Sequence, residues 1–114
     1  SADKLSQLEN KSKVIEKIIE VIIPEPEFID QNYKLTKKAD DGNEYEYTVK
    51  IKNINKDKAK IYLVLINAKG EEADAVLMKF AQGGSKFEDI KTYSVTYKFK
   101  QGGQFSHRYK VLTE

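Results

Sequence analysis

The stretch Glu44-Tyr45-Glu46-Tyr47-Thr48-Val49-Lys50-Ile51-Lys52 alternates polar and apolar side chains, and it decides the class of fold. Successive side chains of a β-strand point to opposite faces, so the apolar residues of this stretch line one buried face while the polar residues meet water. One buried and one wet face are typical of an antiparallel sheet. We therefore predict an antiparallel β-protein built around this strand.

The same period of two continues from Pro26 to the C-terminus. Further strands are predicted at 28–37, 60–67, 73–81, 93–99 and 105–111, separated by polar or glycine-containing turns. Residues 73–81 are also rich in good helix formers, so a short helix there stays open. The predicted core comprises Tyr47, Val49, Ile51, Ile61, Leu63, Leu65, Val76, Phe80, Val95, Tyr97, Phe99, Phe105 and Tyr109.

The last two predicted strands flank the turn signal Gln101-Gly102-Gly103. A three-residue loop with a left-handed glycine would place Phe99 opposite Phe105 and Val95 opposite Tyr109, which gathers the aromatic side chains on one face. We therefore predict that 93–99 and 105–111 form a hairpin.

Residues 3–23 show helical rather than strand spacing. Their apolar side chains recur at steps of three and four when the polar gap at Ser12 is counted. They form a single stripe of Leu5, Leu8, Ile15, Ile19 (or Ile18) and Ile22. Asp3 is a suitable N-cap. Pro24 and Pro26 end the helix near Ile23, because proline lacks a backbone N–H and restricts the residue before it.

The 60–67 strand is apolar on both faces, so it needs a cover on each. We predict that the helical stripe packs on the face formed by Tyr62, Val64 and Ile66. The alternative is a helix that contacts a partner protein or a second copy of the chain.

Length and composition set the outer bounds. The 114 residues allow one domain, which we divide into a helix and proline-containing linker at 1–26 and an antiparallel β domain at 27–114. The chain has no cysteine, which excludes disulfides, cysteine nucleophiles and thiolate metal sites. No apolar run approaches the ~18–20 residues of a membrane span. Because the sequence opens with Ser1 rather than Met, we expect an upstream segment that places the protein outside the cytoplasm or anchors it at a membrane, although a cytoplasmic location stays open.

Four segments carry a resemblance to a known family: Tyr47–Asn53, Lys58–Leu65, Ala68-Lys69-Gly70 and Gly83-Gly84-Ser85-Lys86-Phe87. Together they resemble the Ig-like modules of the CARDB and FxLYD kind over about residues 44–111. Gly83 stands where that family often has proline, and no Tyr-Asp pair follows the third strand. The resemblance implies an Ig-like antiparallel sandwich of about six strands in an extracytoplasmic adhesion, spacer or assembly module without catalysis. The competing fold is α+β, with the helix on one curved antiparallel sheet as in cystatin-like or NTF2-like domains.

The sequence offers little to catalysis or to metal binding. His107 is the only histidine and lacks a cysteine or a second histidine as partner. The oxygen-rich run Asp40, Asp41, Asn43 and Glu44 fits no EF-hand spacing and is explained by turn chemistry. Neither glycine pair has the form of a phosphate-binding loop. We therefore predict no enzyme activity, no catalytic residue, no cofactor and no metal.

Function is then expected at surfaces. We predict a non-enzymatic protein-binding or assembly module of an extracytoplasmic or cell-envelope protein, which contacts a protein partner or self-associates through the helical stripe. A second candidate surface is the basic outward face of the last hairpin, made of Lys98, Lys100, Arg108 and Lys110. Nucleic acid is not expected there, because the aromatic side chains point the other way. The alternative function is small-ligand binding in a cavity lined by Tyr45, Tyr93, Tyr97 and Tyr109.

Overall fold

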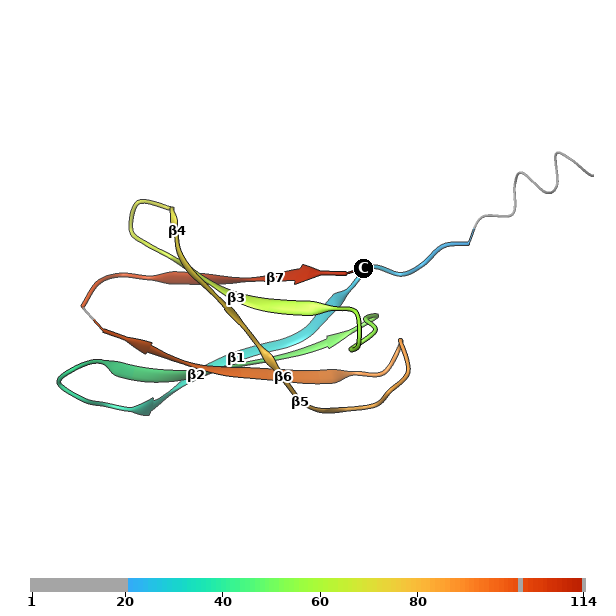
Figure 1. Cartoon of the computed structure of the whole chain (residues 1–114), viewed down its shortest axis with the longest axis horizontal. Helices are drawn as coiled ribbons and strands as arrows, with labels where there is room; N and C mark the ends of the chain where they lie inside the picture. The colour runs from blue at the N-terminus through green and yellow to red at the C-terminus, as the bar shows by residue number, and fades with distance from the viewer. Residues whose placement is uncertain (1–20, 101, 114) are drawn as a thin grey trace, which may run out of the picture.

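A computed structural model describes residues 21–100 and 102–113 of the chain. These residues form seven strands: β1 (Glu27–Lys37), β2 (Asn43–Lys52), β3 (Lys60–Ile66), β4 (Glu72–Leu77), β5 (Lys79–Gly83), β6 (Lys91–Phe99) and β7 (Ser106–Leu112). One sheet has the order β1-β2-β6-β5 and the other the order β4-β3-β7, and every pairing is antiparallel. Figure 1 shows the two sheets as two layers. The predicted antiparallel β-protein is confirmed, and its strands form two sheets rather than one curved sheet.

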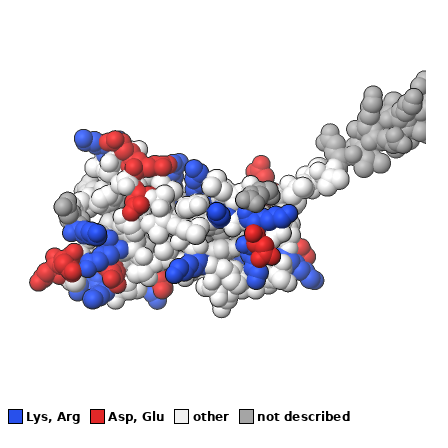
Figure 2. Space-filling model, in the orientation of Figure 1, with Lys and Arg blue, Asp and Glu red and all other residues white. Residues whose placement is uncertain are grey.

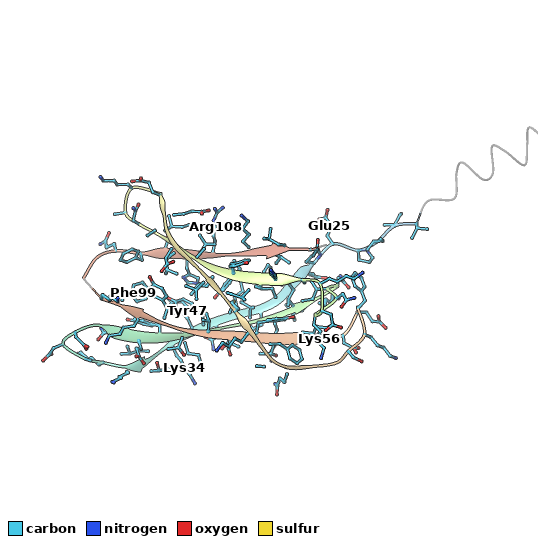
Figure 3. The ribbon with its side chains drawn as sticks, viewed as in Figure 1. Glu25, Lys34, Tyr47, Lys56, Phe99 and Arg108 are labelled. Atoms are coloured by element: carbon cyan, nitrogen blue, oxygen red, sulfur yellow. The ribbon has the colours of Figure 1, made fainter. Side chains whose placement is uncertain are left out.

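The core lies between the inward faces of β2 and β3. Val49, Ile51, Ile61 and Leu63 are fully buried there, as the alternating pattern predicts. Burial of each such side chain contributes roughly 1.5–3 kcal/mol before conformational entropy is subtracted. In Figure 3, Tyr47 lies between the two layers.

Residues 73–81 are extended, so the strand prediction is confirmed over the helical alternative, but the segment divides between the two sheets. β4 pairs with β3 and β5 pairs with β6, and the chain crosses from one sheet to the other at buried Met78, whose backbone N–H donates to the carbonyl of Ile61 at 2.8 Å. Because β4 and β5 are both edge strands, Val76 is only half-buried and Phe80 is 39% exposed. Their placement in the core was therefore wrong, as was that of Phe105, which is 42% exposed.

The predicted hairpin of the last two strands is wrong. β6 pairs with β2 and β5, whereas β7 pairs with β3 in the other sheet, so Val95 lies opposite Tyr47 and Tyr109 lies opposite Leu63. The connection between β6 and β7 crosses the sandwich, and the two aromatic faces meet across the core instead of side by side. Alternation specifies which side chains share an interior, and it does not specify which strands exchange hydrogen bonds.

The segment before β1 also departs from expectation. Val21, Ile22 and Ile23 are not helical, and they are 86%, 85% and 70% exposed. The helix predicted to reach Ile23 therefore does not include these three residues, and the rest of that helix, with its packing on β3, lies outside the described residues. Val64, one of the residues it was expected to cover, is buried.

Candidate functional site

The sandwich is closed along one long side and open along the other. On the closed side, β4 and β5 are joined through Met78, so the chain itself links the two sheets. On the other side β1 ends one sheet and β7 ends the other, and contacts such as Tyr33 with His107, at 5.1 Å between ring centroids, bring the two strands together.

Because the three-stranded sheet faces a four-stranded sheet, part of β1 is not covered by strands of the opposite sheet. Tyr33 and Leu35 pair with Tyr47 and Tyr45 of β2 and so share the inward face, yet they are 56% and 48% exposed. No strand of the described chain lies beyond β7 to shield them. We call the surface formed by β7 together with Tyr33 and Leu35 the open edge.

The outer edge of β7 is the most regular of the four sheet edges in the described chain. β7 pairs with β3 through seven consecutive residue pairs without a register shift. The pairings of β1, β4 and β5 are each interrupted by a shift. Bulges and irregular pairing discourage the addition of a further strand, whereas an uninterrupted edge offers a continuous row of backbone donors and acceptors. β7 is therefore the edge best suited to accept another strand.

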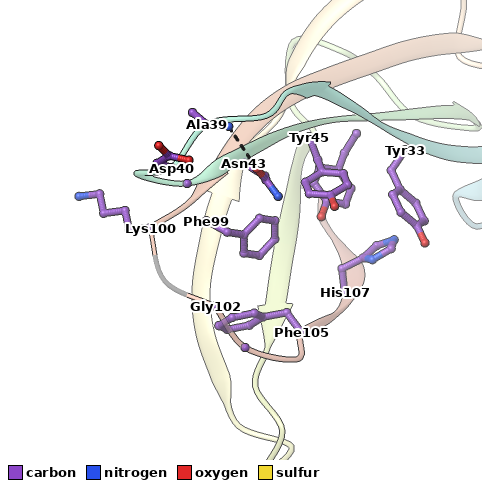
Figure 4. Close-up of a pocket in the computed structure, with 13 residues that line it drawn as sticks. Tyr33, Ala39, Asp40, Asn43, Tyr45, Phe99, Lys100, Gly102, Phe105 and His107 are labelled. Carbon is purple, nitrogen blue, oxygen red and sulfur yellow. Dashed lines mark hydrogen bonds between the residues drawn. The ribbon is translucent and has the colours of Figure 1, made fainter.

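A cavity of about 480 Å³ opens at one end of the open edge, between the β1–β2 turn and the start of β7. Figure 4 shows its aromatic side chains around the hollow. The aromatic lining comes from both sheets and consists of Tyr33, Tyr45, Tyr47, Phe99, Phe105 and His107. Several of these rings contact one another edge to face, as Tyr47 does with His107 at 5.0 Å between centroids.

The β1–β2 turn forms the polar end of this cavity. The Asn43 side-chain oxygen accepts a hydrogen bond from the Ala39 backbone N–H at 3.3 Å, and the Gly42 N–H donates to the Ala39 carbonyl at 3.1 Å. Gly42 has φ 139°, and a Cβ atom on it would lie 2.3 Å from the Phe99 carbonyl oxygen. Glycine is thus required for the turn to approach the end of β6.

Burial favours the neutral form of three aromatic side chains of the open edge and its cavity. It lowers the pKa of His107 and raises the pKa of Tyr47, and it raises the pKa of Tyr109 to about 12. No carboxylate or amine appears among the causes of the His107 shift. The site therefore combines a neutral aromatic part with a polar end, where Asp40 and Lys100 also line the cavity.

Of the tyrosines predicted to line a cavity, only Tyr45 does so. Tyr93 and Tyr109 are packed inside with hydroxyl groups that have no hydrogen-bond partner among the described residues, and the Tyr97 hydroxyl donates to Asp74 at 2.9 Å. The sequence reasoning missed Tyr33, which carries a third tyrosine onto the face shared with Tyr45 and Tyr47.

The four predicted basic residues do not share one face. Lys98 belongs to β6, where its Nζ lies 2.7 Å from Asp41, and Arg108 and Lys110 belong to β7 in the other sheet, where Arg108 pairs with Glu72. Lys100 lines the cavity. Figure 2 shows basic and acidic residues intermixed on the face in view.

The oxygen-rich turn uses two of its members locally, since Asn43 holds the turn and Asp41 pairs with Lys98. Within 21–100 and 102–113, no three histidine, cysteine, aspartate or glutamate residues are grouped so that they could hold a metal ion. Of the predicted helix interface, only Ile22 falls in the described range, and it is 85% exposed. The part of the chain that the structure describes contains no helix of the length and apolarity that a membrane crossing requires.

Comparison with known proteins adds nothing to this geometry: no family model, curated protein or solved structure matches the chain.

Proposed function

We propose that this chain is a non-enzymatic, Ig-like protein-binding module of an extracytoplasmic or cell-envelope protein, and that it binds by accepting an extended segment of its partner alongside β7. The observation that carries the proposal is the pairing of a regular free edge on β7 with the uncovered side chains of Tyr33 and Leu35. An added strand would satisfy the free edge of β7 and cover the exposed side chains of β1 at the same time. Its backbone would pair with β7, and its inward side chains would cover β1.

The sheet orders support the Ig-like part of the proposal. Antiparallel sheets of four and three strands that face each other, with connections that cross between the layers, are the architecture of such sandwiches. Proteins of this architecture bind through edges and loops on a rigid scaffold.

The aromatic cavity supplies specificity in this reading. Strand addition gains affinity from main-chain hydrogen bonds, and it gains selectivity from pockets that take alternate side chains. A partner segment along β7 would pass the cavity, which Tyr33 and Phe105 help to line, and could insert one bulky apolar side chain there. Buried aromatic anchors of this kind dominate the binding energy of protein interfaces.

The test uses a designed peptide that alternates valine or isoleucine with glutamate and lysine, and a control peptide of the same composition with prolines at alternate positions. We expect the first peptide to slow amide hydrogen exchange in β7 and to leave β5 unchanged. Tyr33→Ser should weaken this binding, because it removes an apolar side chain from the open edge. Leu77→Ser is the matched control, since Leu77 is 48% exposed against 56% for Tyr33 but lies on β4, at the edge of the three-stranded sheet opposite to β7. Protection of β5 instead of β7, or equal loss in both variants, would contradict the proposal.

Small-ligand binding is the second candidate, and the cavity volume favours it. About 480 Å³ falls in the range of pockets that hold small organic molecules, roughly 300–1,000 Å³. The probe is indole, an aromatic fragment of suitable size, and the readout is the NMR signals of His107, which are unambiguous because the chain has one histidine. Saturating indole that leaves these signals unmoved would exclude this candidate.

A further inference from the structure

We propose that the strand accepted by β7 is residues 17–23 of a second copy of this chain, so that two molecules exchange these segments. The inference rests on the proposed function, because it names the occupant of the same open edge.

The described part of this segment exposes apolar side chains to solvent. Val21, Ile22 and Ile23 are three consecutive apolar residues with exposures of 70–86%. Five of the seven residues in 17–23 are β-branched, and such residues favour strands. A strand of seven residues also has the length of β7, which spans Ser106–Leu112.

The side-chain pattern of 17–23 fits the two environments along β7. In a strand, Ile19, Val21 and Ile23 lie on one face and can cover the inward side chains of β1. Glu20 then lies on the opposite face between Ile18 and Ile22. That is the outer face, where β7 carries Arg108 and Lys110, so Glu20 supplies the charge that can pair with them. Opposite charges on neighbouring strands stabilise the pair, and they set which face turns outward.

The linker favours a second copy over the same molecule. To reach its own β7, the segment would have to reverse direction within Pro24-Glu25-Pro26. Each proline fixes its own φ, and each biases the preceding residue toward an extended conformation. Figure 1 shows residues 21–26 leading away from the sandwich at the start of β1. A segment that leaves in this direction is available to a neighbouring molecule.

The first experiment measures the mass of the full chain by light scattering over a range of concentrations. We expect a dimer whose β7 amides exchange slowly. Ile19→Pro should weaken it by about 100-fold, because proline removes a donor from the added strand and clashes with pairing. Asn10→Pro is the control, since it would break a helix that joins two copies but lies outside 17–23. A dimer that Asn10→Pro abolishes would refute the exchange of strands.

The second experiment reverses a charge. Glu20→Lys should weaken the dimer by about two- to five-fold, as expected for an exposed ion pair, and Lys110→Glu in the same chain should restore it. Failure of the second change to restore the dimer would contradict the register proposed here.

The outcomes separate this inference from the proposed function. A monomer with unprotected β7 amides would overturn the exchange, yet protection of β7 by the designed peptide would still support strand binding. A monomer with protected β7 amides would also overturn the second copy as the donor. If neither the chain nor the peptide protects β7, both proposals fail.

Discussion

Replacing Gly42 by alanine tests how the cavity is built, because this residue holds the β1–β2 turn against the end of β6. Two costs arise from the one added methyl group. The φ of 139° lies in a region that residues with a Cβ rarely adopt, and the new atom would sit 2.3 Å from the Phe99 carbonyl oxygen. Atoms at that distance must separate to at least 3.0 Å, so the turn or the end of β6 has to move.

The backbone strain alone is expected to cost about 1–3 kcal/mol. The overlap adds to it, since the obstructing atom belongs to backbone that β2 and β6 hold in register through the pair Asn43 with Phe99. For a chain of this length, a loss of about 1–3 kcal/mol lowers the midpoint of thermal unfolding by about 4–12 °C.

Thermal and urea unfolding followed by circular dichroism measure the midpoint temperature and the free energy of unfolding if the transition is two-state. Gly102→Ala is the control, because Gly102 has no left-handed φ and no atom lies within 4 Å of the place its new methyl group would take. We expect that control to change the free energy of unfolding by less than about 0.5 kcal/mol. A Gly42→Ala variant as stable as the Gly102→Ala variant would refute the close approach of the turn to β6.

Three further predictions concern the core and the titratable groups. Ile54→Ala should cost about 2–5 kcal/mol because Ile54 is 1% exposed, whereas Ile90→Ala, at a position 49% exposed, should cost under about 1 kcal/mol, and urea unfolding compares them. Burial lowers the pKa of His107, so the unfolded chain binds that proton more tightly; stability should be full above about pH 6.5 and should fall as the pH drops toward the folded pKa. Urea unfolding at about pH 7.5 and about pH 5 should show a smaller difference in His107→Gln than in the unmodified chain, and an equal difference would contradict the burial of the ring. Ultraviolet titration should show Tyr109, identified by its loss in Tyr109→Phe, ionising near its raised pKa of about 12, and ionisation near the ordinary value of about 10 would contradict its burial.

The strands themselves were predictable because each carries its own alternation. β2 and β3 show the pattern most clearly, and their inward residues are the ones most deeply buried. Which strands pair with each other was harder to predict, because backbone hydrogen bonds between strands do not depend strongly on the type of side chain. Tyr97, Phe99 and Tyr109 pack against one interior as predicted, whereas Phe105 is exposed, and the main error lay in placing both strands in one sheet.

The candidate site could not be predicted for a related reason. It exists because one sheet has three strands where the other has four, and this difference follows from the crossing at Met78 within a segment that reads as one continuous strand. Tyr33 alternates in the same way as a core residue would. Only the number of strands in the facing sheet shows that no described strand covers it.

The crossing residue also provides a natural reporter of how often the sandwich opens. Met78 is the only methionine of the chain, and it is 3% exposed at the point where the two layers are joined. Conversion of its thioether to the sulfoxide needs contact with the oxidant, so the rate of modification by dilute peroxide follows the frequency with which this seam separates. Mass spectrometry of the intact chain therefore measures, without any label, how often the two sheets separate locally at Met78.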